Sequence, residues 1–168
     1  MYDAGTWRDY FVMVGGGAAS LTGLVFVAMS MHLADIVANP THRHRARTIL
    51  VGLTAVFIRC ALALMGGQTA HAIAAEIFVV LVGVEIILLR SVNAALRGGG
   101  SGQPGVVFRT LGSFVCLLIE QCGAIILFFG NAWGLYAVGV GMMASFLFMV
   151  SGAWLLLVGG EAPGPKTV

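Results

Sequence analysis

The stretch Thr48–Gly67, TILVGLTAVFIRCALALMGG, decides the fold because Arg59 is its only charged residue. An α-helix rises about 1.5 Å per residue, so this segment is long enough to cross the roughly 30 Å hydrocarbon core of a bilayer. It therefore predicts a membrane-spanning helix. An ionised side chain in hydrocarbon is costly unless it is paired or hydrated, so Arg59 marks a candidate site.

Four further apolar runs have the same character. They are Tyr10–Leu33, Ala70–Leu89, Thr110–Phe129 and Ala132–Gly159. In lipid, only helices and closed barrels satisfy all backbone polar groups, and five segments this apolar do not fit a barrel. We expect an all-α integral membrane protein, with residues 1–168 forming one transmembrane domain of five helices.

The composition supports the same class. The chain has 168 residues, of which 59% are hydrophobic and 10% charged, whereas a soluble domain has about 45–50% apolar and about 25% charged residues. The net charge of +2 is small and the basic residues lie mainly between the apolar runs, which argues against a nucleic-acid partner. The lipid bilayer is the expected partner.

The connections between the apolar runs predict the orientation. Residues 39–47 contain three arginines, and the segment around the flexible Gly/Ser loop 98–105 contains Arg90, Arg97 and Arg109. The other two connections carry no charge. Basic loops stay in the cytoplasm, so five crossings place the N-terminus outside and the C-terminus in the cytoplasm.

The first basic loop has two interpretations. Arg43, Arg45 and Arg47 are a topology signal, and they are also a predicted contact for anionic lipid headgroups. Arginine outnumbers lysine eight to one, a bias that we interpret as bacterial. We therefore expect a multi-pass protein of a bacterial inner membrane.

Small residues predict where helices pack closely. Gly15, Ala19 and Gly23 follow one another at four-residue steps in the first helix, and such faces let membrane helices approach. The partner is either another helix of the chain or a second copy.

Three charged residues predict an intramembrane charge layer. Arg59 and Glu120 each lie on the small-residue face of their helix, and Glu76 lies at a similar depth, about 15–20 Å from the cytoplasmic edge. Two carboxylates against one arginine leave one acid uncompensated. The layer is either an ion or proton pathway or a buried ion pair that only fixes helix register.

A second polar site is expected nearer the cytoplasm. Glu85 is nine residues from Glu76 and so lies on the opposite face of the same helix. It is close enough to the membrane edge to reach Arg90 or Arg109.

The sequence offers no chemistry for catalysis, a metal or a cofactor. The three cysteines are dispersed, there is no HExxH or GxSxG motif, and His32 and His71 lie at opposite membrane edges; zinc sites, hydrolases and haem need other arrangements. We expect a non-enzymatic, homo-oligomeric channel or transport protein for small ions or protons, with the Arg59 layer as gate or relay. The alternative is an accessory subunit of a larger membrane complex.

Overall fold

The protein forms a bundle of long helices. The computed structural model describes residues 4–38, 40–97 and 104–158, and this part of the chain is helical apart from short turns. The helices are α1 (Ala4–Met31), α2 (Leu33–Ala38), α3 (Pro40–Ala63), α4 (Ala70–Arg97), α5 (Pro104–Phe128) and α6 (Trp133–Val158). Five of them, all except α2, are long and apolar enough to cross a membrane. The predicted helical class and the five spans are confirmed, while the orientation stays a prediction.

Three helices begin earlier than the apolar runs do: α1 begins at Ala4, before the run that starts at Tyr10, and α3 and α5 begin inside the basic connections. The first basic connection was predicted to be a loop up to residue 47, but α3 starts at Pro40 and includes the basic stretch. Helix α5 starts at Pro104, inside the expected Gly/Ser loop, and residues 98–103 of that loop lie outside the described part. Proline suits the first position of a helix, because its fixed φ is helical and its missing N–H is not needed there.

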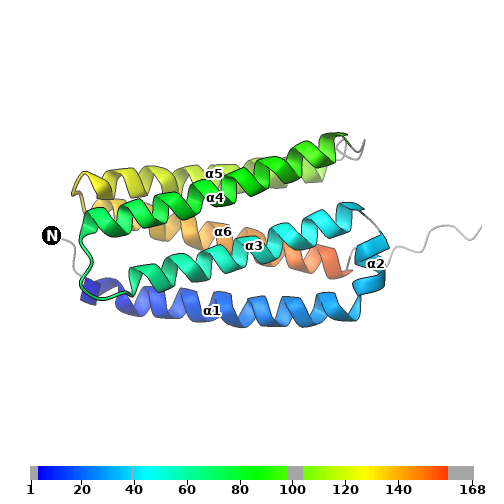
Figure 1. Cartoon of the computed structure of the whole chain (residues 1–168), viewed down its shortest axis with the longest axis horizontal. Helices are drawn as coiled ribbons and strands as arrows, with labels where there is room; N and C mark the ends of the chain where they lie inside the picture. Colours follow the sequence, from blue (N-terminus) through cyan, green and yellow to red (C-terminus); the bar gives the residue numbers. More distant parts are fainter. Residues whose placement is uncertain (1–3, 39, 98–103, 159–168) are drawn as a thin grey trace, which may run out of the picture.

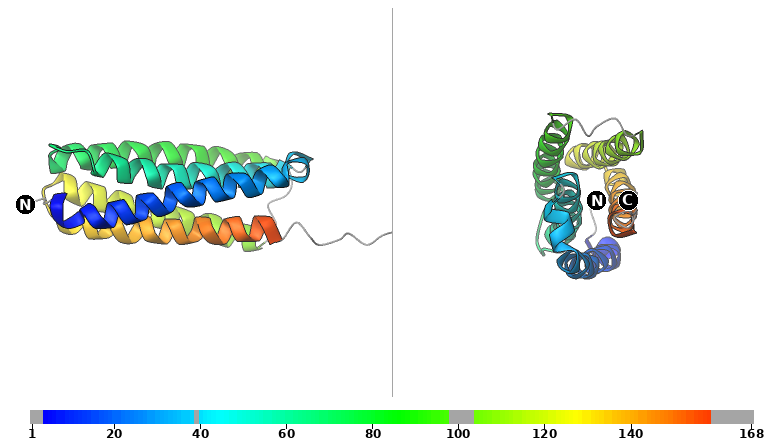
Figure 2. Two further views of the ribbon diagram at one scale, coloured as in Figure 1. Left: turned by 90° about the horizontal axis from the view of Figure 1, so that it is seen from below. Right: turned by 90° about the vertical axis from the view of Figure 1, so that its right-hand side faces the viewer.

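The five long helices pack in two layers. Helices α3 and α4 lie against the α5–α6 hairpin, and α1 runs along α3 at one side (Figures 1 and 2). Helix α3 also contacts α6 across the middle of the bundle. Helices α3 and α5 are diagonal, and no pair of their described Cα atoms lies within 8 Å.

The α5–α6 hairpin is the closest helix pair. Gly130 has a φ of 85°, and the amides of Gly130 and Asn131 donate to the carbonyls of Leu127 and Ile126 at 2.9 and 3.2 Å. This pairing is a Schellman motif, which ends α5 sharply. Gly123 faces Gly134 just beyond the turn, where a side chain on either would meet the other helix's backbone.

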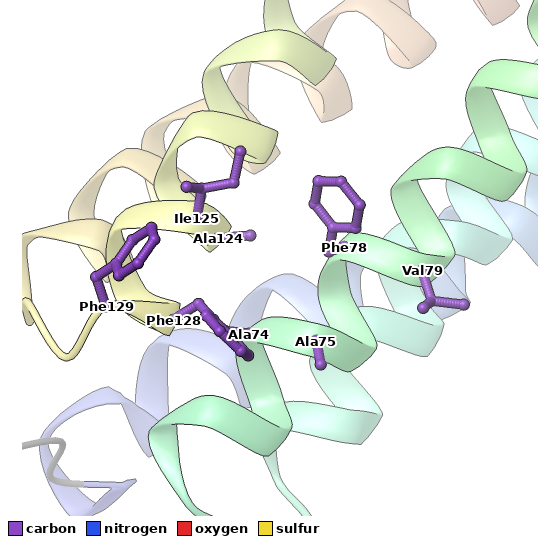
Figure 3. Close-up of a pocket in the computed structure, with 8 residues that line it drawn as sticks. All are labelled: Ala74, Ala75, Phe78, Val79, Ala124, Ile125, Phe128 and Phe129. Atoms are coloured by element: carbon purple, nitrogen blue, oxygen red, sulfur yellow. The ribbon is translucent and has the colours of Figure 1, made fainter.

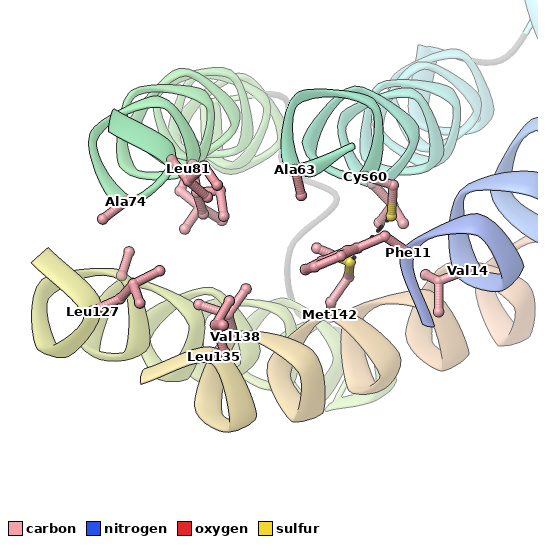
Figure 4. Packing of buried hydrophobic residues seen from close by; sticks show 14 of the residues in the cluster. Phe11, Val14, Cys60, Ala63, Ala74, Leu81, Leu127, Leu135, Val138 and Met142 are labelled. Carbon is pink, nitrogen blue, oxygen red and sulfur yellow. Dashed lines mark hydrogen bonds between the residues drawn. The ribbon is translucent and has the colours of Figure 1, made fainter. Parts of the chain in front are cut away.

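The interior between the layers is filled by apolar side chains. Phe11, Leu81, Leu127 and Met142 come from four different helices and all belong to one buried cluster (Figure 4). A smaller cluster around Leu53 continues the core between α1, α3 and α6. Most of the interior of one chain is therefore packed with apolar side chains.

Helices α4 and α5 leave a groove at the end of the bundle that carries the α3–α4 and α5–α6 turns. Its walls are apolar residues such as Phe78 on α4 and Ile125 on α5, which face each other across the gap (Figure 3). The groove has a volume of about 370 Å³. It lies within two candidate membrane spans, Ala70–Asn93 and Leu111–Phe128.

Candidate functional site

Arg59 lies inside the bundle, and a hydrogen bond to its own helix orients its side chain. It lies four residues before the end of α3, where only 1% of its surface is exposed. Its Nε donates to the carbonyl oxygen of Ala55 at 3.1 Å, one turn earlier. This bond fixes the guanidinium plane and leaves its outer nitrogens for another helix.

That other helix is α5, through an ion pair between Arg59 Nη1 and Glu120 Oε2. Glu120 is completely buried, with 0% exposure. Because the backbones of α3 and α5 are not neighbours, the two long side chains bridge the diagonal of the bundle. The predicted approach of Arg59 and Glu120 is what the structure shows.

Helix α6 completes the environment of Glu120. The hydroxyl of Ser145 donates to Glu120 Oε1 at 2.7 Å, and Ser145 is itself buried. Gly141 lies one turn away, and a Cβ there would collide with Glu120 Cγ and lie 3.1 Å from the carbonyl oxygen of Cys116. The absence of a side chain at Gly141 makes room for the carboxylate.

The sequence pattern did not single out Ser145 or Gly141 as partners of Glu120. Their spacing could have indicated it. Gly141 and Ser145 are four positions apart on α6, which places the serine hydroxyl and the space left by the glycine on one face of the helix. Both carboxylate oxygens of Glu120 thus have a donor, one from Arg59 and one from Ser145. The charge at this site is neutralised within the chain.

The surroundings of the pair are apolar or aromatic. Cys60, the residue after Arg59, has its Sγ 3.5 Å from Met142 Sδ, and Figure 4 shows this sulfur contact. The Tyr10 hydroxyl donates to the carbonyl oxygen of Gly139 at 2.7 Å and ties α1 to α6. Trp7 packs its ring edge-on against Tyr136, with centroids 4.8 Å apart. These contacts join α1 and α3 to α6.

Glu76 belongs to a different group. It is half-buried on α4, and its Oε2 accepts a hydrogen bond from Gln68 Nε2 at 2.8 Å. Gln68 lies in the turn before α4. The expected three-residue layer is therefore divided, since Arg59 pairs with Glu120 and Glu76 pairs with a neutral amide of the α3–α4 turn. Helical phase alone gave no sign of Gln68.

Two oxygen atoms, one in the turn before α4 and one on α4, are buried without a donor among the described residues. They are Gln68 Oε1, beside Glu76, and Glu85 Oε1. Of the predicted partners of Glu85, Arg90 is exposed, and the side chain of Arg109 lies outside the described part. Buried acceptors of this kind are rare in folded proteins, so each calls for a physical explanation.

The small-residue face of α1 is used only at one end. Gly15 is buried, and a Cβ there would lie 2.8 Å from Cys60 Cβ on α3. Ala19 and Gly23 are exposed, with no atom within 4 Å of the position of a Cβ on Gly23. Within one chain, close packing therefore rests on Gly15, and Ala19 and Gly23 are left on the surface.

The basic segment lies at the start of α3. Arg43 and Arg47 are exposed and four residues apart, so they share one face, while Arg45 is half-buried. Among the described residues, no three His, Cys, Asp or Glu side chains lie together in a way that could hold a metal ion.

No protein family, curated protein or solved structure matches this chain.

Proposed function

We propose that the protein conducts protons or small cations across a membrane as a homo-oligomer, and that the carboxylates of α4 carry them. The observation that supports this is the buried, donor-free Oε1 of Glu85, which lies within the spanning segment Ala70–Asn93. Gln68 Oε1, in the turn just before that segment, is a second oxygen of this kind, and Gln68 hydrogen-bonds the other α4 carboxylate, Glu76. The protein is a non-enzymatic one in this proposal, placed in a bacterial inner membrane.

The charge balance directs the proposal to α4. Glu120 is neutralised by Arg59 and hydrogen-bonded by Ser145, whereas neither Glu76 nor Glu85 contacts a cation within the described residues. A carboxylate in hydrocarbon needs a proton, a cation or water to offset its desolvation. A carboxylate without a fixed partner in the chain can bind and release a proton or a cation, so α4 is the candidate path.

This assigns a different role to the Arg59 layer. A buried ion pair with both carboxylate oxygens satisfied has no free position for a passing ion. The pair of Arg59 and Glu120 then acts as the frame that fixes α3 against α5 and α6. The gate or relay moves to Glu76 and Glu85, about 14 Å apart along the helix axis.

The homo-oligomer follows from the packing of a single chain. Apolar side chains fill most of the space between the two layers, and both α4 carboxylates are partly exposed, on opposite faces of the helix. A water-lined path then forms between copies, with Glu76 and Glu85 contributed to it by different copies. Anionic lipid at Arg43, Arg45 and Arg47 is the proposed contact on the basic side.

Ion flux in liposomes tests the proposal. We expect Glu76→Gln and Glu85→Gln each to remove most of the proton or potassium flux, because glutamine has the same shape but neither releases a proton nor balances a cation. Asp9→Asn is the matched control, since Asp9 is an exposed carboxylate of α1. Wild-type liposomes without flux, or glutamine variants with wild-type flux, contradict the proposal.

The second candidate is an accessory subunit of a larger membrane complex. The exposed Ala19 and Gly23 support it, because a face of small residues on a spanning helix lets a foreign helix approach closely. Size in mild detergent separates the two. A discrete symmetric oligomer of this chain supports the channel, and a stoichiometric complex with unrelated larger subunits supports the accessory role.

A further inference from the structure

The groove between α4 and α5 is a concave strip in the membrane-facing surface. Ala74 and Ala124 are small and buried at its base, and Phe78 and Phe128 stand at its sides (Figure 3). All of its lining residues are apolar. Two alanines opposite each other remove the side-chain volume that fills the rest of the α4–α5 contact, and this leaves about 370 Å³.

His71 bridges the outer end of this groove. Its Nδ1 lies 2.6 Å from the carbonyl oxygen of Phe128, and its ring packs edge-on against the Phe128 ring with centroids 5.4 Å apart. A carbonyl oxygen only accepts, so Nδ1 carries the hydrogen. His71 is exposed, and its Nε2 is the ring nitrogen that Phe128 does not engage.

The groove and His71 lie within the depth of one leaflet of a bilayer. The lining residues on α4 extend from Ala74 to Val79, and His71 lies one residue inside the start of the same helix. The lining covers about 7.5 Å of helix and His71 lies about 4.5 Å before it, within the roughly 15 Å that half of a 30 Å hydrocarbon core provides. A polar side chain at the membrane edge is thus followed inward by apolar walls.

We infer that the groove binds part of one acyl chain of a phospholipid, whose phosphate accepts a hydrogen bond from an N–H at His71 Nε2 at the membrane edge. The occupant follows from the apolar lining within two spanning segments and from the polar side chain at the end where a headgroup lies. Because lipid tails give apolar contacts no hydrophobic drive, the selectivity comes from close packing of a flexible chain against the alanine floor and the phenylalanine walls. This inference is independent of ion conduction.

Photolabelling tests the site in the full-length protein in nanodiscs. The probe is a phosphatidylglycerol with a diazirine in one acyl chain, and mass spectrometry maps the labelled residues. We expect labelling concentrated on α4 residues 74–79 and α5 residues 124–129, saturating near one lipid per chain. Excess unlabelled phosphatidylglycerol competes with it, and a diacylglycerol with the same chains but no phosphate, at the same concentration, does not.

Two variants with matched bulk locate the site. Ala75 lines the groove and is exposed, so Ala75→Phe fills the space without entering the core. Ala61→Phe adds the same ring to an exposed position of α3. We expect Ala75→Phe to reduce groove labelling about fivefold or more, since the lost contacts are dispersive, and Ala61→Phe to leave it unchanged. His71→Phe keeps an aromatic ring and should remove the preference for phospholipid over diacylglycerol.

Three results overturn the inference. Labelling spread evenly over all spanning helices means ordinary surrounding lipid. Equal competition by diacylglycerol means that the phosphate plays no part. Chain-to-chain crosslinks through residues 74–79 mean that a second copy covers the groove. Circular dichroism of each variant shows whether a loss of labelling reflects a loss of folding.

Discussion

Glu120 and Glu85 are glutamates on neighbouring helices, α5 and α4. They differ in burial, in counter-charge and in hydrogen-bond donors. Glu120 is fully buried, paired with Arg59 and bonded to Ser145. Glu85 is half-buried on α4, and its Oε1 has no donor among the described residues. The difference separates a structural carboxylate, whose partners are built into the fold, from one that needs a partner from outside the chain.

The largest effect is expected when the ion pair is broken on one side. Arg59→Leu leaves Glu120 buried without its counter-charge, and such a loss costs about 3–5 kcal/mol of stability. The double variant Arg59→Leu with Glu120→Leu should recover most of this, because two apolar groups replace the pair. Unfolding of purified protein in detergent with increasing SDS, followed by circular dichroism, measures both.

A double variant as unstable as the single one contradicts this explanation. It would mean that Arg59 stabilises the bundle through its stem and its bond to Ala55, and not through Glu120. The comparison with Glu85 would then lose its basis, since a structural carboxylate is defined here by its partner.

A smaller effect is expected at the gap that admits Glu120. Gly141→Ala places a methyl group against Glu120 Cγ and the Cys116 backbone, and overpacking of this kind costs about 1–3 kcal/mol. Gly23→Ala is the matched control, because nothing lies within 4 Å of the new methyl group in one chain.

Stability of the two alanine variants is compared in the same SDS unfolding assay. Equal stability would show that the hairpin moves apart at no cost, so that Glu120 is less tightly enclosed than the contacts indicate. A loss confined to Gly23→Ala would instead point to a second helix docked on the exposed face of α1.

The sequence was sufficient for the spanning helices because twenty apolar residues leave few alternatives in lipid. It also brought Arg59 and Glu120 together, since both lie on small-residue faces. It missed that Glu76 pairs with Gln68, because a turn residue has no helical phase from which its direction can be read. It missed Gly141 and Ser145 as a fitted pocket, since small residues on a helix are equally consistent with plain packing. The start of α3 at Pro40 was missed because the helix was predicted from its apolar run alone. The basic residues before that run were assigned to a loop, although they are helical too.

The smallest effect on stability is expected at Glu85 itself. Glu85→Gln removes a charge that no described residue compensates, so we expect a change within about 0.5 kcal/mol, the usual range for a substitution that breaks no structural contact. Glu120→Gln, the identical chemical change, leaves the Arg59 guanidinium buried without an anion and should cost several times more. The two variants in one unfolding series measure the contrast directly. If Glu85→Gln destabilises the bundle as much as Glu120→Gln does, then Glu85 has a cationic partner in the chain. Its Oε1 would then belong to a second structural ion pair, and α4 would no longer be the candidate path.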